Sequence, residues 1–157
     1  MPDVVKVFTK LREQMPLKLI FVGDGPEKSK VEHMCRETGV CGDIKFLGPQ
    51  KSTKELLAIS DLFILPSETE SFGLAALEAM ACHVPVISTN TGGLPEVVEQ
   101  GYSGYMSNVG DIDDMANNAL AILQNLETFK QNARKTAEKF DIEVIIDQYI
   151  KLYESLV

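Results

Sequence analysis

The stretch Lys18–Pro26, KLIFVGDGP, decides the fold class of this 157-residue chain. Residues 18–22 form a short, nearly unbroken apolar run, which is typical of a strand buried on both faces of a parallel sheet. The turn Gly23-Asp24-Gly25-Pro26 closes the strand and leads into a helix over about 27–38, which Gly39 would terminate. The stretch therefore predicts a buried strand that passes directly into a helix.

The same strand–helix unit recurs along the chain. This alternation indicates right-handed βαβ crossovers, so we predict an α/β fold with a parallel sheet and helices on both faces. Three helices are expected after the last strand, and the broad apolar stripe of the final one should pack on the core or on a neighbouring domain. No linker or repeat divides residues 1–157, so one domain is expected. The expected elements are strands at 44–47, 62–65, 84–88 and 104–106, and helices at 3–14, 53–60, 73–82, 94–99, 111–125, 127–139 and 141–155.

Charge and hydropathy exclude several classes of protein. The chain has 15 basic and 23 acidic residues, a net charge of -8, and no basic block, so it is not expected to bind nucleic acid in general. A small phosphorylated ligand is still possible, because a helix N-terminus can hold it without net positive charge. The longest apolar runs are far shorter than the roughly 18 residues of a membrane span. With no signal-peptide pattern, a cytoplasmic protein is expected.

Two groups of side chains could suggest a metal site. The cysteines Cys35, Cys41 and Cys82 show neither CxxC spacing nor pairing with histidine, so we expect buried thiols in a reducing compartment. The acidic cluster Asp111-x-Asp113-Asp114 stands before a helix, where capping and the helix dipole explain it better than a cation does. No metal site is predicted.

The loop Pro66–Glu78, PSETESFGLAALE, carries the most information about function. In a parallel sheet, ligands bind outside the carboxyl ends of the strands, where such loops lead into helices. Free N–H groups of Phe72, Gly73 and Leu74 at the helix start would suit a diphosphate or a sugar hydroxyl. Gly73 has no side chain to block the approach.

Glu70 and Glu78 are separated by seven residues within this stretch. At about 1.5 Å of rise per helical residue they lie roughly 10–12 Å apart along the axis. Glycosidase carboxylate pairs lie roughly 5–9.5 Å apart, so the spacing favours two separate binding roles. One carboxylate could hold a sugar and the other a ribose, with the diphosphate between them. Alternatively, Glu70 caps the helix and Glu78 is a solvated surface residue.

These residues resemble the Glu-x7-Glu motif of the large family of retaining glycosyltransferases with the GT-B fold. Glu70-Ser71-Phe72-Gly73-Leu74 and Glu78-Ala79-Met80-Ala81 carry the motif. The resemblance covers nearly the whole chain and implies the Rossmann-like C-terminal half of a GT-B fold with extra C-terminal helices. Other matching parts are Val22–Pro26, Phe46–Gly48, Ser60-Asp61, Pro66-Ser67, Pro85–Ile87, Thr91–Glu96 and Gly101-x-x-Gly104.

The resemblance also implies roles for these residues. Glu70, as the catalytic position, would hold hydroxyls of the donor sugar, and Glu78 would bind the ribose. The backbone of Phe46 and Leu47 would read the base, and Gly23 and Gly25 would leave room for the base beside it. The remaining donor-binding positions would be Gly23, Gly25, Ser71, Phe72, Gly73 and Leu74.

The reaction implied by the resemblance transfers a sugar from a UDP-sugar to an acceptor hydroxyl. It retains the anomeric configuration and needs no metal or other cofactor. Within the family the chain resembles bacterial enzymes that transfer N-acetylglucosamine from its UDP form to L-malate in bacillithiol synthesis. N-acetylglucosamine is therefore the suggested sugar.

The sequence departs from the family pattern in two places. His83 stands where the family usually has glycine, and a positive φ there would strain the histidine by about 1 kcal/mol. We interpret His83 as a tolerated helix C-cap and not as a catalytic base. Family members also begin this domain with a strand and a loop bearing an Arg and a Lys for the diphosphate, after an N-terminal acceptor domain. We therefore expect residues 1–157 to be a fragment with little or no transfer activity alone.

Two other functions are compatible with the residues. The chain could be a non-catalytic α/β binding module of the flavodoxin or response-regulator type, with both glutamates at the surface. It could also be half of a UDP-sugar epimerase, although the Glu-x7-Glu pattern disfavours this. The acceptor, the base and the oligomeric state stay open.

Overall fold

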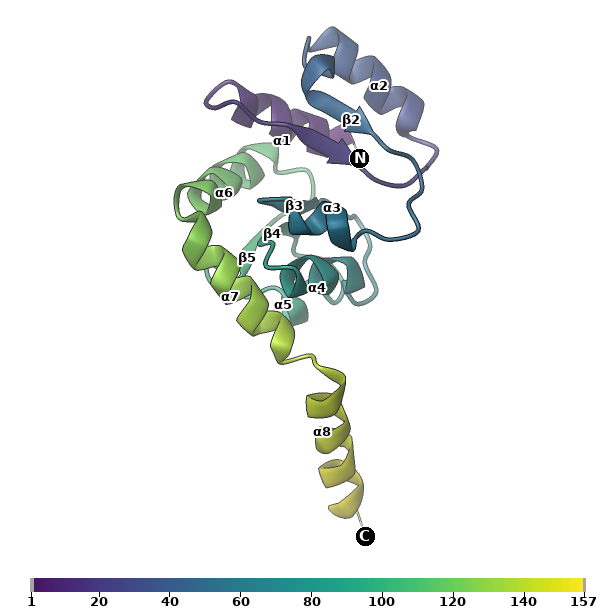
Figure 1. The fold of residues 1–157 in the computed structure, drawn as a ribbon, viewed down its shortest axis with the longest axis vertical. Helices are drawn as coiled ribbons and strands as arrows, with labels where there is room; N and C mark the ends of the chain where they lie inside the picture. Colours follow the sequence, from purple (N-terminus) through teal and green to yellow (C-terminus); the bar gives the residue numbers. More distant parts are fainter. Residues whose placement is uncertain (1, 157) are drawn as a thin grey trace.

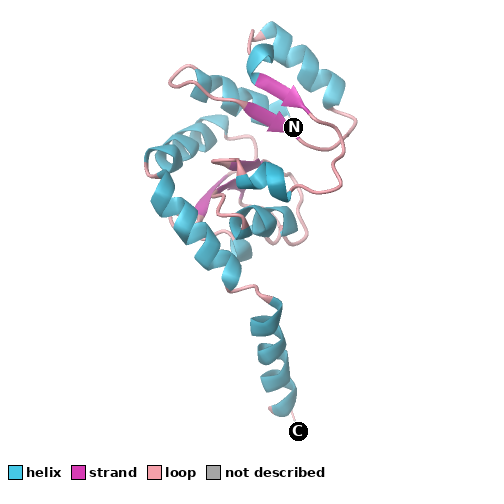
Figure 2. Cartoon of the chain, viewed as in Figure 1, coloured by secondary structure: helices cyan, strands magenta, loops and turns pink. Residues whose placement is uncertain are grey.

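A computed structural model describes residues 2–156, which alternate between strands and helices as the apolar pattern predicts (Figures 1 and 2). Each predicted strand and helix is present, with ends shifted by a few residues. The elements are α1 (Pro2–Arg12), β1 (Leu19–Phe21), α2 (Lys28–Glu37), a 3-10 turn η1 (Cys41–Asp43), β2 (Ile44–Phe46), α3 (Lys54–Ala58), β3 (Phe63–Leu65), α4 (Leu74–Ala81), β4 (Val86–Thr89), α5 (Leu94–Val97), β5 (Gly104–Ser107), α6 (Ile112–Gln124), α7 (Leu126–Glu138) and α8 (Ile142–Glu154).

All pairs of neighbouring strands are parallel, which confirms the fold class. The expected single sheet is nevertheless divided into two. β1 pairs with β2, whereas β3, β4 and β5 form a separate sheet in that order. Within residues 2–156 no strand lies between β1 and β3, so each of the two ends its sheet as an edge strand.

Three apolar clusters hold the helices on these sheets. One face of the β3–β4–β5 sheet packs against α4, α5 and α7, and the other face packs against α1 and α6. A third cluster joins α1 and α2 to the β1–β2 sheet. Helix α1 therefore contacts both sheets, and helices cover both faces as predicted. Fully buried side chains of the three clusters include Met80, Val86 and Leu94, then Val7, Ile87 and Ile122, and finally Val5 and Val31.

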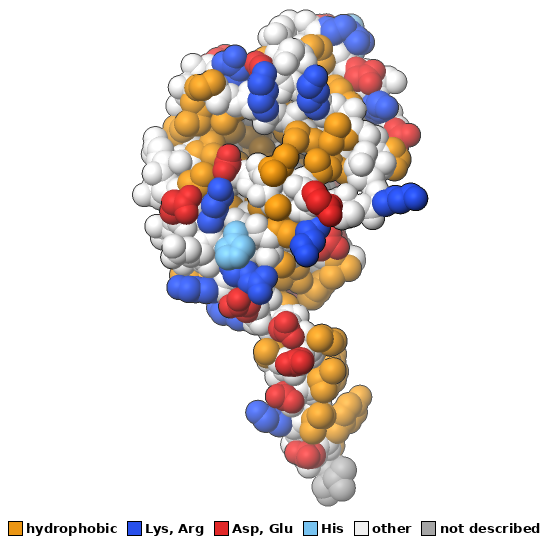
Figure 3. Space-filling view, in the orientation of Figure 1, with side chains coloured by type: hydrophobic (Ala, Val, Ile, Leu, Met, Phe, Trp, Pro, Cys, Tyr) orange, Lys and Arg blue, Asp and Glu red, His pale blue; other side chains and the backbone are white. Residues whose placement is uncertain are grey.

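Helix α8 projects away from the rest of the molecule (Figure 1). Its apolar side chains line one side of the helix in Figure 3, and none of its residues is buried. Ile142 is 67% exposed and Tyr153 65% exposed. Packing of this helix on the core of the chain was therefore the wrong expectation. A neighbouring domain stays a prediction. No helix of the described part of the chain is long and apolar enough to cross a membrane.

The expectation of three free thiols is wrong for two of the cysteines. Cys35 and Cys41 form a disulfide across the end of α2, with Cα atoms 4.9 Å apart, and Cys82 is free. Gly39 has a φ of 72°, and Val40 N–H donates to the Cys35 carbonyl at 3.1 Å. This tight helix end turns the chain back, which brings Cys41 beside Cys35. The helix end at Gly39 was predicted, but the pairing of the two cysteines across it was not.

Two predicted helix ends are confirmed. His83 has a φ of 62° at the end of α4, where its N–H donates to the Met80 carbonyl and Val84 N–H donates to the Ala79 carbonyl, both at 3.0 Å. These two bonds define a Schellman C-cap, which glycine usually occupies. Asp111 Oδ1 accepts the N–H of Asp114 at 3.1 Å and so caps α6.

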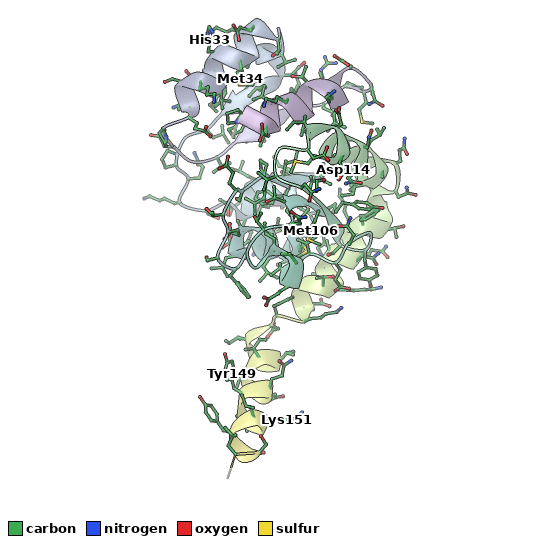
Figure 4. The ribbon with its side chains drawn as sticks, turned by 180° about the vertical axis from the view of Figure 1, so that it is seen from behind. His33, Met34, Met106, Asp114, Tyr149 and Lys151 are labelled. Atoms are coloured by element: carbon green, nitrogen blue, oxygen red, sulfur yellow. A yellow bond between two sulfur atoms is a disulfide. The ribbon has the colours of Figure 1, made fainter. Side chains whose placement is uncertain are left out.

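Two further side chains lie at the surface of their helices in Figure 4. His33 lies on the outer side of α2, where its Nε2 contacts Glu37 Oε1 at 3.2 Å, as expected of a surface histidine. Asp114 lies on α6, and no group of three or more potential metal ligands occurs among residues 2–156.

Candidate donor site

The loop between β3 and α4 ends on a glycine that no other residue could replace without strain. Gly73 is the N-cap of α4 and has a φ of 98°, a region that L side chains rarely adopt. An added Cβ would also lie 3.0 Å from Cδ2 of the buried Leu94. Gly73 therefore serves both the turn and the packing of α5 against this loop.

Glu70 closes the loop onto the helix start. Its Oε1 accepts the Gly73 N–H at 3.3 Å, and the side chain is half-buried. The Gly73 carbonyl accepts the N–H groups of Ala76 and Leu77 at 3.0 and 3.1 Å. The prediction that the N–H of Gly73 is free is therefore wrong. The contact agrees with the alternative prediction, in which Glu70 caps the helix.

Of the three predicted donors, the N–H groups of Phe72 and Leu74 therefore remain available. Among residues 2–156, the N–H groups of Phe72, Leu74 and Ala75 have no acceptor, because they precede the first intrahelical bonds. Leu74 is largely exposed and Phe72 is 40% exposed. The ring of Phe72 meets the ring of Phe140 edge to face, with ring centroids 6.3 Å apart. Backbone donors therefore reach the surface at Phe72, Leu74 and Ala75.

Gly92 and Gly93 allow the loop after β4 to contact the backbone of the Glu70 loop directly. An added Cβ at Gly92 would lie 1.5 Å from the carbonyl oxygen of Glu70, and one at Gly93 would lie 2.7 Å from Phe72 Cα. Gly93 N–H donates to the same Glu70 carbonyl at 3.3 Å. The loop after β4 therefore fixes the position of the Glu70 backbone.

Two threonine hydroxyls fix the other end of the Glu70 loop. Thr89 Oγ1 and Thr91 Oγ1 both donate to the Ser67 carbonyl, the latter at 3.1 Å. Thr91-Gly92-Gly93 is part of the resemblance to the family, but no role was predicted for it. The glycine pair directly after a buried strand was the signal for this close backbone contact.

Glu78 faces a different part of the molecule from Glu70. It is exposed on α4 and lines a cavity of about 1300 Å³, together with Val22, Ser67, Glu68 and Thr69. Glu70 is not part of the cavity wall. The two glutamates therefore do not converge on one point, as separate binding roles require.

The predicted base-reading backbone lies at the end of β2. Leu47 N–H donates to the Phe21 carbonyl at 3.0 Å, and Gln50 Nε2 donates to the Leu47 carbonyl at 2.8 Å, so both backbone groups of Leu47 are occupied. Alternation along a strand turns the N–H and C=O of Phe46 to the outer edge of β2. Phe46 thus has the more accessible backbone of the two. Its ring stacks on Phe21 with centroids 5.2 Å apart.

Gly23 and Gly25 leave open space beside this strand. An added Cβ would meet no atom within 4 Å at either position. Gly23 N–H donates to the Gly48 carbonyl at 2.8 Å, which ties the turns after β1 and β2 together. These residues do not line the cavity that holds Glu78. The structure therefore places the predicted residues in two groups. One group lies at the carboxyl ends of β1 and β2, and the other lies in the loop between β3 and α4 and in α4 itself.

Charged pairs with shifted pKa values lie outside these loops. Hydrogen bonds from Lys18 and Arg12 lower the pKa of Asp43, with Arg12 Nε 2.7 Å from Asp43 Oδ2. A hydrogen bond from Lys139 at 2.6 Å lowers the pKa of Glu99. Both pairs join elements far apart in the sequence and have structural roles.

Comparison with known proteins places the chain among sugar-transferring proteins. A family model described as glycosyl transferases group 1 matches residues 1–139. N-acetyl-alpha-D-glucosaminyl L-malate synthase of Bacillus anthracis is 43% identical over 155 residues, which cover 96% of this chain and 41% of that protein. D-inositol 3-phosphate glycosyltransferase of Corynebacterium jeikeium is 36% identical over 138 residues, which cover 84% of this chain and 33% of that protein.

Solved structures share the fold. Anabaena Alr3699/HepE in complex with UDP and glucose superposes with a TM-score of 0.80 and 28% identity, over 96% of this chain and 44% of that chain. The pneumococcal O-GlcNAc transferase GtfA in complex with UDP and GlcNAc has a TM-score of 0.85 at 21% identity, over 98% of this chain and 32% of that chain, which is a likeness of fold alone. The chain spans about two-fifths or less of the length of the two curated relatives.

Proposed function

The chain belongs to the glycosyl transferases group 1 family, and from this premise we propose that it is the UDP-sugar donor-binding domain of a retaining glycosyltransferase. The observation that carries the proposal is the Glu70 loop, held at the start of α4 by Gly92 and Gly93, with Glu78 exposed further along the same helix. This arrangement supplies two carboxylates and free backbone donors at the carboxyl end of a parallel strand, where ligands bind in such folds.

Each part of the donor meets a different group in this proposal. Glu70 accepts hydrogen bonds from hydroxyls of the sugar, and Glu78 accepts them from the ribose. The N–H groups of Leu74 and Ala75 face the diphosphate, at the positive end of the α4 dipole. The outer backbone edge of Phe46 faces the base.

The reaction belongs to a longer chain. There, the bond from the anomeric carbon to the diphosphate oxygen is replaced by a bond to the acceptor oxygen with the same configuration. An N-terminal domain supplies the acceptor, so residues 1–157 alone give little or no transfer. N-acetylglucosamine is the proposed sugar because the B. anthracis relative is named for it. A metal-free reaction and a cytoplasmic location stay predictions.

Family membership argues against the alternative of a flavodoxin-like module. Of the relatives reported above, one is named a glucosaminyl malate synthase, one a glycosyltransferase, and a third is solved with UDP and glucose. No feature of residues 2–156 favours an epimerase half. We therefore propose the transferase function alone.

The test is calorimetric titration of UDP into the purified chain and into Glu78→Ala. A hydrogen bond to a charged group contributes about 1.5–3 kcal/mol, so loss of the Glu78 carboxylate should weaken UDP binding by roughly 10- to 100-fold. Glu127→Gln is the matched control, because Glu127 is an exposed carboxylate on α7 outside the cavity.

Two results would contradict the proposal. One is the absence of saturable UDP binding at millimolar concentration in a longer chain that carries the N-terminal half. The other is an equal affinity for UDP in wild type and Glu78→Ala. Turnover of a UDP-sugar by residues 1–157 alone would contradict only the need for the longer chain.

A further inference from the structure

Hydrogen bonds hold the Glu70 loop on both sides of Ser71 and Phe72 but not at these two residues. The Glu70 carbonyl accepts the Gly93 N–H, and Glu70 Oε1 accepts the Gly73 N–H, both at 3.3 Å. Among residues 2–156, neither the backbone of Ser71 nor that of Phe72 takes part in a hydrogen bond. The turn that leads into α4 therefore contains two residues that only packing can position.

The side chain of Phe72 supplies this packing. Its ring meets the ring of Phe140 edge to face, with centroids 6.3 Å apart and ring planes at 77°. The backbone of Phe72 also contacts Gly93, where an added Cβ would lie 2.7 Å from Phe72 Cα. Edge-to-face pairs are directional, because the positive edge of one ring faces the negative face of the other. A fixed ring at Phe140 therefore fixes the orientation of Phe72.

Phe140 is itself held firmly at the end of α7, which lies beside α4 and α5 (Figure 1). Its N–H donates to the Ala137 carbonyl at 3.0 Å, and its ring packs against the buried cluster that α4, α5 and α7 share. Thr136 Oγ1 and Lys139 Nζ both donate to Glu99 Oε1, at 3.0 and 2.6 Å, which ties this end of α7 to the residues after α5. Phe140 is therefore a fixed point on an element distant in sequence from the Glu70 loop.

The position of Phe72 matters because its neighbours are the candidate contacts to the sugar and the diphosphate. Glu70 precedes it by two residues, and the unpaired N–H groups of Phe72 and Leu74 lie on either side of Gly73. A rotation of the Phe72 backbone would turn these donors and strain the bond from the Gly73 N–H to Glu70. The groups proposed for the ribose and the base lie on α4 and β2, outside this turn.

We propose that Phe140 is a positioning residue for the donor. Its ring holds Phe72, so that the Glu70 carboxylate and the neighbouring backbone donors face the sugar and the diphosphate in one arrangement. This inference rests on the proposed function and adds to it a residue that does not touch the donor and acts through Phe72 alone. Loss of the ring should weaken the contacts to the sugar and the diphosphate and leave those to the uridine intact.

The test titrates UDP and UDP-N-acetylglucosamine into the full chain that the gene encodes, as wild type and as Phe140→Leu. Leucine keeps an apolar side chain in the cluster and removes the ring edge. The affinity for UDP-N-acetylglucosamine should fall by about 2- to 12-fold, because binding must then supply the order that the ring pair had provided. Phe140→Tyr keeps the ring and should retain the affinity, since a hollow of about 280 Å³ beside Phe140 leaves room for the hydroxyl.

Phe129→Leu is the matched control. Phe129 is a second ring on α7, 7% exposed, and it packs on the opposite face of the sheet against Tyr105, with centroids 5.6 Å apart. Its loss should lower the melting temperature at least as much as Phe140→Leu does, because it is the more buried of the two rings. The affinity for UDP-N-acetylglucosamine should nevertheless stay at the wild-type value. The comparison therefore separates positioning from stability.

Two further measurements test the route through Phe72. The effects of Phe140→Leu and Phe72→Leu on affinity should be non-additive, because the second substitution removes a contact that the first has already broken. Without any ligand, the Gly73 amide should exchange about 2- to 12-fold faster in Phe140→Leu, since its bond to Glu70 opens more often. The amide of Ile87, inside the β3–β4–β5 sheet, is the reference.

The inference fails on any of these results. Equal affinities in wild type and Phe140→Leu show that the ring is not needed. An equal loss of affinity in Phe140→Leu and Phe129→Leu shows a general effect of stability, and additive effects of Phe140→Leu and Phe72→Leu show that Phe140 does not act through Phe72. A wild-type chain that binds no UDP contradicts the proposed function and this role with it, whereas wild-type binding with an unaffected Phe140→Leu contradicts this role alone.

Discussion

Replacing Gly92 with alanine tests whether the contact between two loops holds the candidate donor site together. Gly92 has a φ of 57°, and its added Cβ would lie 1.5 Å from the carbonyl oxygen of Glu70. Gly110 is the matched control, because it is also exposed and has a φ of 80°, but an added Cβ there meets nothing within 4 Å. Both substitutions place an alanine at a positive φ, but only the one at Gly92 brings its Cβ against the carbonyl oxygen of Glu70.

The expected magnitudes follow from this difference. A left-handed conformation costs an alanine about 1–2 kcal/mol, and alanine offsets about 0.4–1 kcal/mol by restricting the unfolded chain. Gly110→Ala should therefore lose about 0.5–1 kcal/mol. At Gly92 the Cβ must retreat by about 1.5 Å to reach the 3.0 Å that real contacts keep, which adds about 1–3 kcal/mol of overpacking. Gly92→Ala should lose about 1.5–4 kcal/mol.

Thermal unfolding followed by circular dichroism measures these losses. At about 2–4 °C per kcal/mol for a chain of this size, Gly92→Ala should melt about 3–16 °C lower than wild type, and Gly110→Ala only about 1–4 °C lower. UDP affinity should fall in Gly92→Ala and stay unchanged in Gly110→Ala, because only the former displaces Glu70. Equal melting temperatures for the two variants would refute the reasoning from the contact.

Two further predictions concern stability. His83→Gly should raise the melting temperature by about 1–4 °C, because glycine relieves about 0.5–1 kcal/mol of strain at the C-cap of α4. The exposed histidine side chain makes few contacts that would be lost. An equal gain in His83→Ala would show that the positive φ is not the cause. Asp43→Asn should lower the melting temperature at pH 7, because Lys18 and Arg12 lower the pKa of Asp43 below its ordinary value of 3.8 in the folded chain. The ion pair stabilises the fold above pH 3.8, and this contribution is lost as the pH falls below 3.8 and through the lower folded pKa. The melting temperatures of wild type and Asp43→Asn should therefore converge as the pH is lowered below 3.8. A difference that persists undiminished at pH 3 would contradict this ion-pair explanation.

The features that sequence predicted correctly depend on residues close together in the chain. The apolar run at 18–22 and the glycine turn after it define a strand and its end, because strand burial and turn geometry are local requirements. The C-cap at His83 and the N-cap at Asp111 were likewise readable, since each is settled within one helical turn. The same holds for the position of the Glu70 loop before a helix.

The features that sequence did not predict are contacts whose partners the local pattern does not identify. Gly92 meets Glu70 across 22 positions, and the thiol of Cys41 meets Cys35 only because a helix end turns the chain back. The hydrogen bond from the Gly73 N–H to Glu70 removes one of the three predicted donors, and sequence left this helix-capping contact open as one of two alternatives.

By itself, then, the sequence determined the alternation of strands and helices, the loops that can bind a donor and the family to which they belong. Only the tertiary structure decided that the strands form two sheets, β1–β2 and β3–β4–β5, and that α8 leaves the core. The physical reason is that propensities, caps and turns are set by neighbours within a few residues, whereas a strand's partner and a helix's packing surface are set by whichever distant elements fill the space beside them.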